Sequence, residues 1–442
     1  MTFDEAINYL LSLGHETLAM KLGLTNIERL LSALDQPQKE YLKIQIAGTN
    51  GKGSTASMLA AIARLAGIET GLYTSPHLIS ITERIKINGK EISKEDFARL
   101  TLQVKETAER LVGEGDLEML PTFFEHVTAI ALLAFKEARV DIAILETGLG
   151  GRLDATTAAK AEIVGITQIA LDHQEYLGDT LDQVAAEKAA IIHEGVKAII
   201  APQEPSTMDV ILKRCDEVGV EPIIEGSTFE VEGVSSDGRI IATFKTTQNS
   251  ELKTQNSIYP HVHSNLRGRH QLINASVAIS LAESLEDFGF SISRAAVIEG
   301  LETVTHAGRL EQWSAQHPIL FDGAHNVAGA MALRDYLIEF VTEPITLVFG
   351  AMREKEIDEI ASLLFPLAEH IILTKPDSPR AASPESLVQS IPENFDVVKV
   401  KLTSNVSEAL RLAHEITSRE GLICMTGSLY LVGEAQKILK EG

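Results

Sequence analysis

The feature that most restricts the possible folds of this chain is a glycine-rich loop between a strand-like and a helix-like segment. Residues 43–48 read KIQIAG, a short apolar run, and residues 54–68 read STASMLAAIARLAGI, which is typical of a buried helix. The loop that joins them gives residues 47–54 the sequence AGTNGKGS. At such a junction, backbone N–H groups at the helix start can point at phosphate oxygens. The loop therefore predicts a phosphate-binding site beside a parallel sheet.

Within this loop the side chains complement the backbone. Lys52 supplies a cation and Ser54 a hydroxyl that can reach a metal ion, while Gly48 and Gly51 permit tight turns. The spacing is shorter than in the usual phosphate loop, because Ile46 stands at the place of the first glycine and Gly53 separates Lys52 from Ser54. The alternative is a glycine-rich turn that binds nothing. The agreement of motif and context favours nucleotide binding by Thr49, Asn50, Gly51, Lys52, Gly53 and Ser54.

Alternating apolar and amphipathic segments predict an α/β fold with two domains. Strand-like runs at 69–75, 140–148 and 161–170 alternate with helical patterns, which is typical of a parallel sheet. A second series begins with PILFDGAHN and continues with ITLVFGAM, HIILTKP, FDVVKVKL and GLICMTGS. We therefore predict a phosphate-loop, parallel-sheet ATPase domain over residues 1–297 and a smaller Rossmann-like α/β domain over 298–442. Residues 228–245 alternate around Asp237-Gly238, which predicts an inserted β-hairpin.

Charge and cysteine content exclude several classes of partner. The 39 Lys and Arg against 62 Asp and Glu give a formal net charge of −23, and no dense basic segment offsets it, so nucleic acid and anionic membrane surfaces are not expected to bind. Cys215 and Cys424 are the two cysteines, which excludes a disulfide framework. The first residues lack the basic region of a signal peptide, and the apolar runs are too short to span a bilayer. We expect a cytoplasmic protein.

A series of further motifs, in a fixed order, carries a family resemblance. They include TSPHL at 74–78, FE at 124–125, ETGLGGRLDAT at 146–156, DH at 172–173, EKA at 187–189, HQ at 270–271, NA at 274–275, GR at 308–309, DGAHN at 322–326 and GSLY at 427–430. Together with GTNGKGS, this set resembles the folate branch of the Mur ligase superfamily, which contains dihydrofolate synthases and folylpolyglutamate synthases. The resemblance extends from about residue 18 to 434.

This resemblance implies a site for two magnesium ions. Ser75 would bind one of them with ATP, and Glu146 and His173 would hold the second between ATP and the substrate carboxylate. Lys188 would carry carbon dioxide as a carbamate and help to bind the second ion, so that Lys52, His173 and Lys188 form the catalytic set. Taken alone, Ser75 could cap a turn, Glu146 could be a strand-end carboxylate, His173 could bond within a loop, and Lys188 could be a surface lysine.

The same resemblance implies how ATP is held between the domains. Asn274 would contact the adenine from the first domain, Arg309 would lie near the phosphates, and Asp322 would contact the nucleotide from the second domain. Closure of the second domain over residues 293–309 as a hinge would exclude water from a reactive intermediate. On the residues alone, Arg309 could form an ordinary ion pair and Asp322 could cap a helix.

The expected acceptor is a pterin-containing carboxylate. The resemblance assigns its pocket to Thr122, Phe123, Phe124, Glu125, Leu153, Asp154 and Ala155, with Met20 and Leu22 from the N-terminal segment, and it places His325 near phosphate or glutamate. Aromatic stacking and a carboxylate that bonds to the aminopyrimidinone edge are chemically suitable for a pterin. The alternative for Phe123 and Phe124 is a place in the core at a helix start.

The implied activity is ATP-dependent addition of L-glutamate to dihydropteroate and to tetrahydrofolate through an acyl phosphate, by a monomer. The alternatives are an enzyme with the polyglutamate activity alone, another Mur-type amino-acid ligase, and a regulator that binds nucleotide without catalysis. The chain departs from the usual family pattern at Thr157, at His306-Ala307, at Ala190 and at the charged quartet 353–356. These departures lie in the substrate loop, the hinge, the α-helical segment that contains Lys188 and a loop of the second domain.

Overall fold

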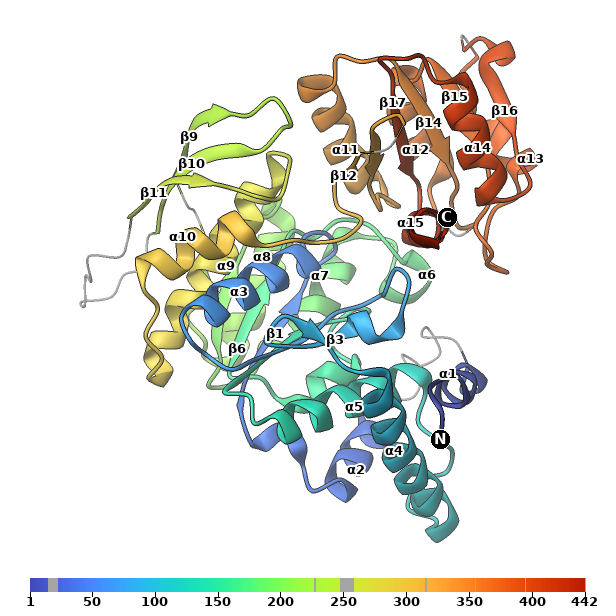
Figure 1. Ribbon diagram of the computed structural model, residues 1–442. Helices are drawn as coiled ribbons and strands as arrows, with labels where there is room; N and C mark the ends of the chain where they lie inside the picture. Colours follow the sequence, from blue (N-terminus) through green and yellow to red (C-terminus); the bar gives the residue numbers. More distant parts are fainter. Residues whose placement is uncertain are drawn as a thin grey trace.

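A computed structural model describes residues 1–14, 23–225, 228–246, 258–314, 316–353, 355–393 and 395–441. Figure 1 shows two α/β units joined by the segment that follows α10, with a small sheet beside the first unit. In the described part of the chain, no helix combines the length and the apolar character that crossing a membrane requires.

The first unit is built on an eight-stranded sheet in the order β4-β3-β2-β5-β1-β6-β7-β8. The strands are parallel except at one edge, where β3 pairs antiparallel with β2 and with β4. Their bounds are β1 Leu42–Ala47, β2 Thr70–Tyr73, β3 Ile85–Ile87, β4 Lys90–Glu91, β5 Ile142–Glu146, β6 Ile163–Ile166, β7 Lys197–Ile200 and β8 Ile223–Ile224. The helices are α1 Phe3–Ser12, α2 Thr25–Ala33, α3 Lys52–Leu65, α4 Lys94–Glu114, α5 Phe123–Ala138, α6 Gln174–Leu177, α7 Leu181–Ala189, α8 Pro205–Val218, α9 His270–Ser284 and α10 Arg294–Thr303.

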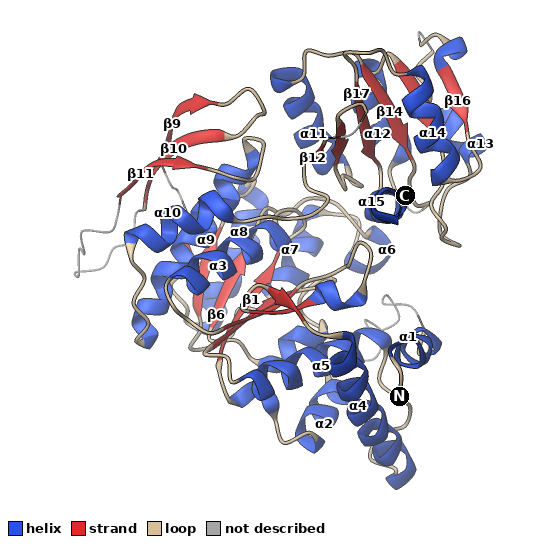
Figure 2. Ribbon diagram, in the orientation of Figure 1, coloured by secondary structure: helices blue, strands red, loops and turns tan. Residues whose placement is uncertain are grey.

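Both faces of this sheet are covered, which explains the nearly continuous apolar runs of its strands. In β5, Ile142 and Ile144 face the core under α3, α9 and α10, whereas Ala143 and Leu145 face the core under α4 and α5. The period-two alternation of strand side chains produces this split. β2, β5, β1 and β6 are adjacent parallel strands, so their carboxyl ends, and the loops that follow them, lie at one edge of the sheet. Figure 2 shows α3 and α9 on one side of this sheet and α4 and α5 on the other.

The predicted hairpin is present and gains a third strand. β9 (Thr228–Val234) and β10 (Ile240–Lys245) pair antiparallel around a turn in which Gly238 has φ +75°. β11 (Ile258–His263) pairs with β10 to complete the small sheet. Ile240, Ala242 and Phe244 face α9 and α10, so one face of the sheet joins the first core.

The second unit contains a six-stranded sheet in the order β12-β13-β17-β14-β15-β16, parallel except for β12. The strands are β12 Glu311–Trp313, β13 Ile319–Phe321, β14 Ile345–Phe349, β15 His370–Leu373, β16 Val400–Leu402 and β17 Leu422–Thr426. The helices are α11 Val327–Phe340, α12 Ile357–Leu364, α13 Pro384–Leu387, α14 Val406–Ile416 and α15 Leu429–Glu441. The predicted fold class is confirmed.

Two sequence expectations need comment. The strand expected over 395–402 is restricted to β16, because Asp396 accepts a hydrogen bond from the Val398 N–H and starts a short 3-10 helix instead. The expected division after residue 297 falls inside α10, whose Leu301 belongs to the core of the first unit. Residues 304–310 connect α10 to β12.

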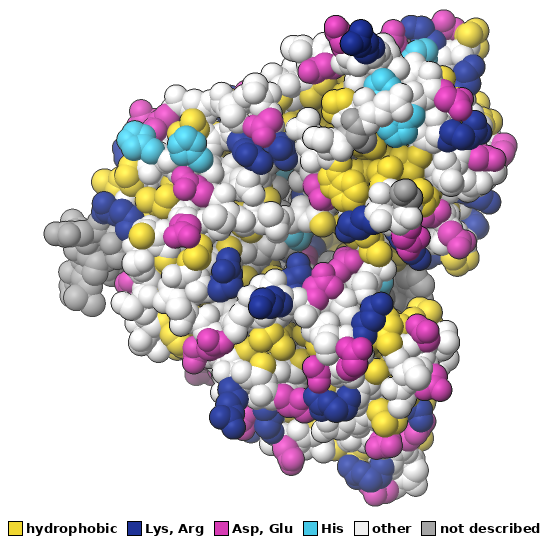
Figure 3. Space-filling model, viewed as in Figure 1, with side chains coloured by type: hydrophobic (Ala, Val, Ile, Leu, Met, Phe, Trp, Pro, Cys, Tyr) yellow, Lys and Arg dark blue, Asp and Glu magenta, His cyan; other side chains and the backbone are white. Residues whose placement is uncertain are grey.

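Charged side chains of both signs are scattered over the face seen in Figure 3, and its basic side chains do not gather into a continuous patch.

Candidate active site

The glycine-rich loop leaves β1 and begins α3, as predicted. Gly48 has φ +149°, and a Cβ added there would lie 1.9 Å from Thr167 Oγ1. Gly51 has φ +90° and lies against the Asn274 side chain, where a Cβ would approach Asn274 Oδ1 to 2.2 Å. Gly51 is the N-cap of α3 and offers no side chain to the first-turn N–H groups. The helix start is therefore shaped to receive an anionic group.

Lys52 folds back onto this loop. Its Nζ donates to the carbonyl oxygens of Gly48 at 3.0 Å and Thr49 at 3.1 Å. Burial lowers the pKa of Lys52 from its usual value, against the opposing effects of Glu146 and Asp172. The loop itself is fixed on the neighbouring strand connection, since Thr49 Oγ1 donates to the Ala170 carbonyl at 2.8 Å.

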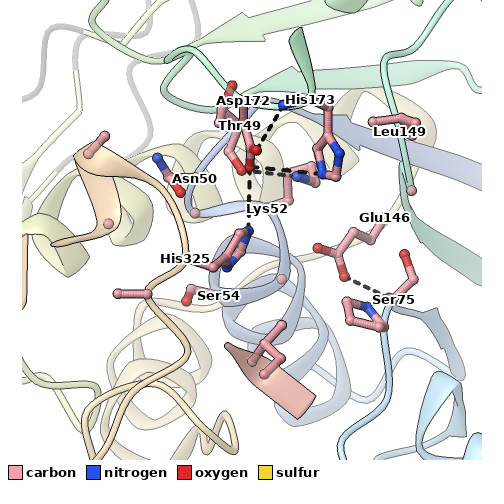
Figure 4. Close-up of a pocket in the computed structure, with 18 of the residues that line it drawn as sticks. Thr49, Asn50, Lys52, Ser54, Ser75, Glu146, Leu149, Asp172, His173 and His325 are labelled. Carbon is pink, nitrogen blue, oxygen red and sulfur yellow. Dashed lines mark hydrogen bonds and ion pairs between the residues drawn. The ribbon is translucent and has the colours of Figure 1, made fainter. Parts of the chain in front are cut away.

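A cavity of about 280 Å³ opens above the loop, between the two α/β units. Its walls include most of the residues that the sequence assigned to the site: Thr49 to Ser54, Ser75, Phe124, Glu146, Leu153, Asp154, Ala155, His173, Lys188, Asn274, Arg309, Asp322 and His325. In Figure 4, Glu146 and Ser75 lie together on one side and Asp172, His173 and His325 on the other, with Lys52 between them. Segments distant in sequence thus surround one space.

Lys188 lies beneath the loop rather than on the surface. It stands on α7, is 4% exposed, and donates from Nζ to the Gly48 carbonyl at 2.9 Å. Burial, reinforced by the charge of Lys52, lowers the pKa of Lys188 to about 7. A substantial fraction of this amine is therefore neutral and nucleophilic near neutral pH.

Glu146 and Ser75 face each other across two adjacent strand ends. Glu146 ends β5 and accepts the Ser75 N–H on Oε2 at 3.0 Å. Burial raises the pKa of Glu146, while Lys52 opposes that rise. Glu146 lines the cavity, and carboxylate oxygens are the ligands that a hard cation prefers.

Asp172 and His173 lie in the connection after β6 and form a strained corner, in which Asp172 is buried and His173 is partly exposed. His173 has φ +52° at the N-cap of the short helix α6, a backbone conformation that is uncommon for residues other than glycine. Burial lowers the pKa of His173 to about 4, although Asp172 acts in the opposite direction. The imidazole is consequently neutral and able to coordinate a metal.

The residues present fit a nucleotide-bound magnesium ion. In the described part of the chain, no three His, Cys, Asp or Glu side chains come together as a metal cluster. Magnesium retains water and phosphate ligands, so a hydroxyl and one or two carboxylates suffice beside a nucleotide. Ser75 and Glu146 supply such oxygens, and a carbamate on Lys188 would supply another.

Some of the residues expected to contact the pterin line the cavity, and others do not. Phe124, Leu153 and Ala155 line it. Asp154 also lines it, but both of its carboxylate oxygens are occupied: Oδ2 accepts from the N–H groups of Gly148 and Leu149, and Oδ1 accepts from the backbone and hydroxyl of Thr156. Asp154 therefore holds the shape of the loop that follows β5.

Three other expected pterin contacts lie behind the cavity wall. Thr122 and Glu125 form the capping box at the start of α5. Phe123 is 6% exposed and packs in the core beneath the Arg84 guanidinium. Met20 and Leu22 lie outside the described residues. Contact of these five residues with a substrate stays a prediction.

The hinge segment contacts the phosphate loop directly. His306, one of the departures from the family pattern, has its Nδ1 2.9 Å from Ser57 Oγ on α3. Its ring also covers Gly53, where a Cβ would lie 2.9 Å from His306 Cε1. In the second unit, Asp322 accepts the N–H groups of Leu310 and Ala324, and burial raises its pKa.

Sequence reasoning did not assign several residues that line the cavity. Asp172 was noted only as part of a motif, Lys355 only as part of a charged quartet, and Arg380 not at all, yet all three lie at the cavity. Gln271 donates to Ser54 Oγ at 3.3 Å and accepts from Asn274, and so braces the helix start. The sequence around charged loop residues of the second unit, such as Lys355 and Arg380, does not indicate that they reach a cavity beside the first unit.

Comparison with known proteins agrees with this architecture. Residues 46–282 match the Mur ligase middle domain and residues 308–429 match the Mur ligase glutamate ligase domain. A dihydrofolate synthase/folylpolyglutamate synthase from Mycobacterium tuberculosis is 33% identical, with 94% of this chain and 90% of the relative covered. The structure of M. tuberculosis folylpolyglutamate synthase complexed with ADP aligns with a TM-score of 0.87 at 31% identity over 98% of both chains.

Two further structures are described with other ligands. An Escherichia coli protein in complex with DHPP and ADP has a TM-score of 0.85 at 26% identity, covering 100% of this chain and 98% of that one. A bifunctional folylpolyglutamate synthase/dihydrofolate synthase with Mn, AMPPNP and L-glutamate bound has a TM-score of 0.84 at 27% identity, with the same coverage. The middle-domain match alone spans more than half of the 442 residues. The chain belongs to the Mur ligase family.

Proposed function

We propose that this protein is a bifunctional dihydrofolate synthase/folylpolyglutamate synthase. It adds L-glutamate to dihydropteroate and to tetrahydrofolate with ATP, and releases ADP and phosphate. The observation that carries this proposal is the single cavity in which the phosphate loop, the Glu146–Ser75 pair, Lys188 and the Phe124–Leu153 wall meet. The full-length relatives with the same pair of activities in their names support it.

The first half of the reaction makes the acceptor reactive. A carboxylate oxygen of the pterin substrate attacks the γ-phosphorus of ATP, the bond to the β-phosphate oxygen breaks, and ADP leaves with the bonding electrons. The product is an acyl phosphate. The phosphate loop and Lys52 stabilise the charge on the transferring group, because they present N–H donors and a cation at the start of α3.

The second half forms the amide. The glutamate amine attacks the acyl carbon, the tetrahedral intermediate collapses, inorganic phosphate leaves, and the amine loses a proton. This sequence needs no protein nucleophile, so the task of the chain is to position two substrates and to exclude water. The site lies between two units, which lets the second unit cover the acyl phosphate.

Ser75, Glu146 and His173 would hold the divalent ions, which when bound supply positive charge to the phosphates. The uncharged fraction of Lys188, whose pKa is about 7, can form an N–C bond to carbon dioxide and lose one proton to solvent, which gives an anionic carbamate beside Gly48. That change replaces a cation by a metal-binding oxygen pair. Magnesium is the expected ion, and structures of relatives contain Mn.

Asn274, Arg309 and Asp322 are proposed to hold ATP, and Phe124, Leu153 and Ala155 are proposed to face the pterin. His325 is proposed to lie near glutamate or phosphate. A monomeric state and a cytoplasmic location stay predictions, as does the division of the chain after residue 297.

Mass spectrometry of products tests the function. Purified protein with magnesium, ATP and glutamate is incubated with dihydropteroate or with tetrahydrofolate, and Lys52→Ala serves as the control for contaminating activity. A glutamate mass increment on both acceptors is expected. An increment on tetrahydrofolate alone would reduce the proposal to a polyglutamate enzyme, and none on either acceptor would refute it.

A further inference from the structure

Asp172 belongs to the first unit but obtains most of its partners from the second. Its Oδ2 lies 3.1 Å from Asn326 Nδ2 and 3.4 Å from His325 Nε2, and its Oδ1 contacts the Lys355 ammonium. In the described part of the chain, its own unit supplies only His173, through the N–H at 2.8 Å and the ring Nε2 at 3.9 Å. One carboxylate therefore joins three side chains across the interface.

The ion pair with Lys355 is largely enclosed. The Lys355 side chain is 9% exposed and the Asp172 side chain 8%. Two residues after Asp172 and one residue after Lys355, Gln174 Nε2 donates to Glu356 Oε1 at 2.8 Å. Two adjacent polar contacts thus fix the segment before α12 against the corner at His173.

This contact bears directly on His173. The positive φ of His173 is a strained conformation, and strain of this kind persists only where the surroundings fix it. Its N–H is held by Asp172, whose position is in turn set by the second unit. In Figure 4, Asp172, His173 and His325 converge on the same side of the pocket.

We propose that Lys355 is a positioning residue that fastens the Asp172–His173 corner to the second domain when the domains close. When the domains separate, Lys355 and Asp172 would each be hydrated, so neither charge is unfavourable in the open state. Closure removes this water from both side chains. In the closed state each of the two charges needs the other as its partner, because an unpaired buried charge is strongly unfavourable. The placement of His173 and the closed position of the second domain become one event.

A double-mutant cycle tests this proposal, whose kinetic part rests on the proposed ligase activity. Lys355→Met and Asp172→Asn are each expected to lower kcat about 100-fold, and the double variant to lower it by about the same factor. Binding of ADP with magnesium is expected to weaken by a much smaller factor than kcat, because the phosphate loop is intact and only the contacts from the second unit are loosened. Lys437→Met, a change at an exposed lysine of the same unit, is the matched control.

The cysteine content allows a sharper rescue. Cys215 and Cys424 are both buried, so Lys355→Cys can be alkylated selectively with bromoethylamine to give a lysine analogue with sulfur in its chain. Recovery of at least about tenfold in kcat is expected after alkylation. Recovery would show that a folded protein lacked only the ammonium group.

A measurement without turnover separates this proposal from the proposed function. Spin labels at Glu95→Cys and Val398→Cys, both exposed and on different units, report the interdomain distance by electron–electron resonance with ADP and magnesium bound. A single short distance is expected in the parent protein, and a broader or longer one in Lys355→Met. The positioning role would be overturned if the kcat effects of the two single variants multiply in the double variant. It would also be overturned if Lys355→Met has the interdomain distance or the turnover of the parent protein. Absence of folate turnover in the parent protein, with the distance change present, would overturn the proposed function alone.

Discussion

At the scale of single residues, Lys188 has the most informative environment in the site. An ordinary surface lysine was the alternative from sequence, but the side chain is buried under the phosphate loop and donates to Gly48. Burial and Lys52 bring its pKa to about 7. Near neutral pH the amine therefore exists both as a cation, which burial disfavours, and as a neutral group that can react.

Removal of the Lys188 amine is expected to cripple turnover. Lys188→Ala should lower kcat at least about 100-fold, because the proposed carbamate and its metal-binding oxygens are lost. Addition of a small carboxylate such as acetate should restore part of the rate by occupying the vacated space. Steady-state kinetics with and without acetate check this, and a variant with normal turnover would contradict the metal-binding role.

The same pKa has a consequence for stability. A lysine whose pKa falls from 10.5 to about 7 on folding binds fewer protons in the folded state, so its contribution to the free energy of unfolding increases as pH rises through that interval. In carbon-dioxide-free buffer, Lys188→Met should therefore be more stable than the parent protein at about pH 6.5. That advantage should shrink by about 2 kcal/mol by about pH 9. Urea unfolding at both pH values measures it, and a constant difference would contradict the low pKa.

At the scale of elements, close packing of α10 on α3 decides where the first domain ends. Gly300 lies against the Ile62 backbone, where a Cβ would come within 2.9 Å of Ile62 N and 2.8 Å of its Cα. Backbone atoms cannot move aside as a flexible side chain can. The helix that precedes the hinge is therefore fixed to the helix that carries the phosphate loop.

A pair of glycine substitutions tests this contact. Gly300→Ala should lower the free energy of unfolding by about 1–3 kcal/mol, because overpacking outweighs the gain in helix propensity. Gly113→Ala, in α4 with no atom within 4 Å of the added Cβ, should leave stability unchanged or raise it by up to about 1 kcal/mol. Chemical denaturation of both variants checks the difference. Equal effects would show that α10 and α3 do not depend on this contact.

Apolar sequence patterns predicted some of the strands and not others. Apolar runs located β1, β2, β5, β6, β13, β14, β15 and β17, whose residues are nearly all buried. The more exposed edge strands β4, β8 and β12 gave no such run. The pattern over 395–402 misled because Val397 and Val398 are 71% and 72% exposed, so their apolar character reflects no core contact. Local capping by Asp396 decided the structure there. The third strand of the small sheet follows a segment with no clear turn signal.

At the scale of the whole molecule, the cavity depends on contacts between segments hundreds of residues apart. The phosphate loop after β1, Glu146 at the end of β5 and Lys188 on α7 all line this cavity, and their roles there stay predictions from the ordered motifs. Lys355 and Arg380 carry no motif that relates them to the first unit, and only the relative placement of the two sheets brings them to the cavity. Asn50 and Asn326 likewise bond across the interface at 3.1 Å.

Because both units line one cavity, nucleotide binding should protect both. With an ATP analogue and magnesium at about 100 times Kd, binding stabilises the folded state by about 2.7 kcal/mol. We expect slower amide hydrogen exchange at residues 49–54 and also at 324–329, at the start of α11.

Gly48→Ala should abolish the nucleotide-dependent protection from hydrogen exchange in both segments. A Cβ there would collide with Thr167, whereas Gly67→Ala, also at positive φ but with open space around it, imposes strain without a collision and is the matched control. Exchange measured by mass spectrometry with and without the nucleotide compares the two variants. Protection confined to residues 49–54 in the parent protein would mean that nucleotide binds the first unit alone, and that closure of the second unit awaits the other substrates.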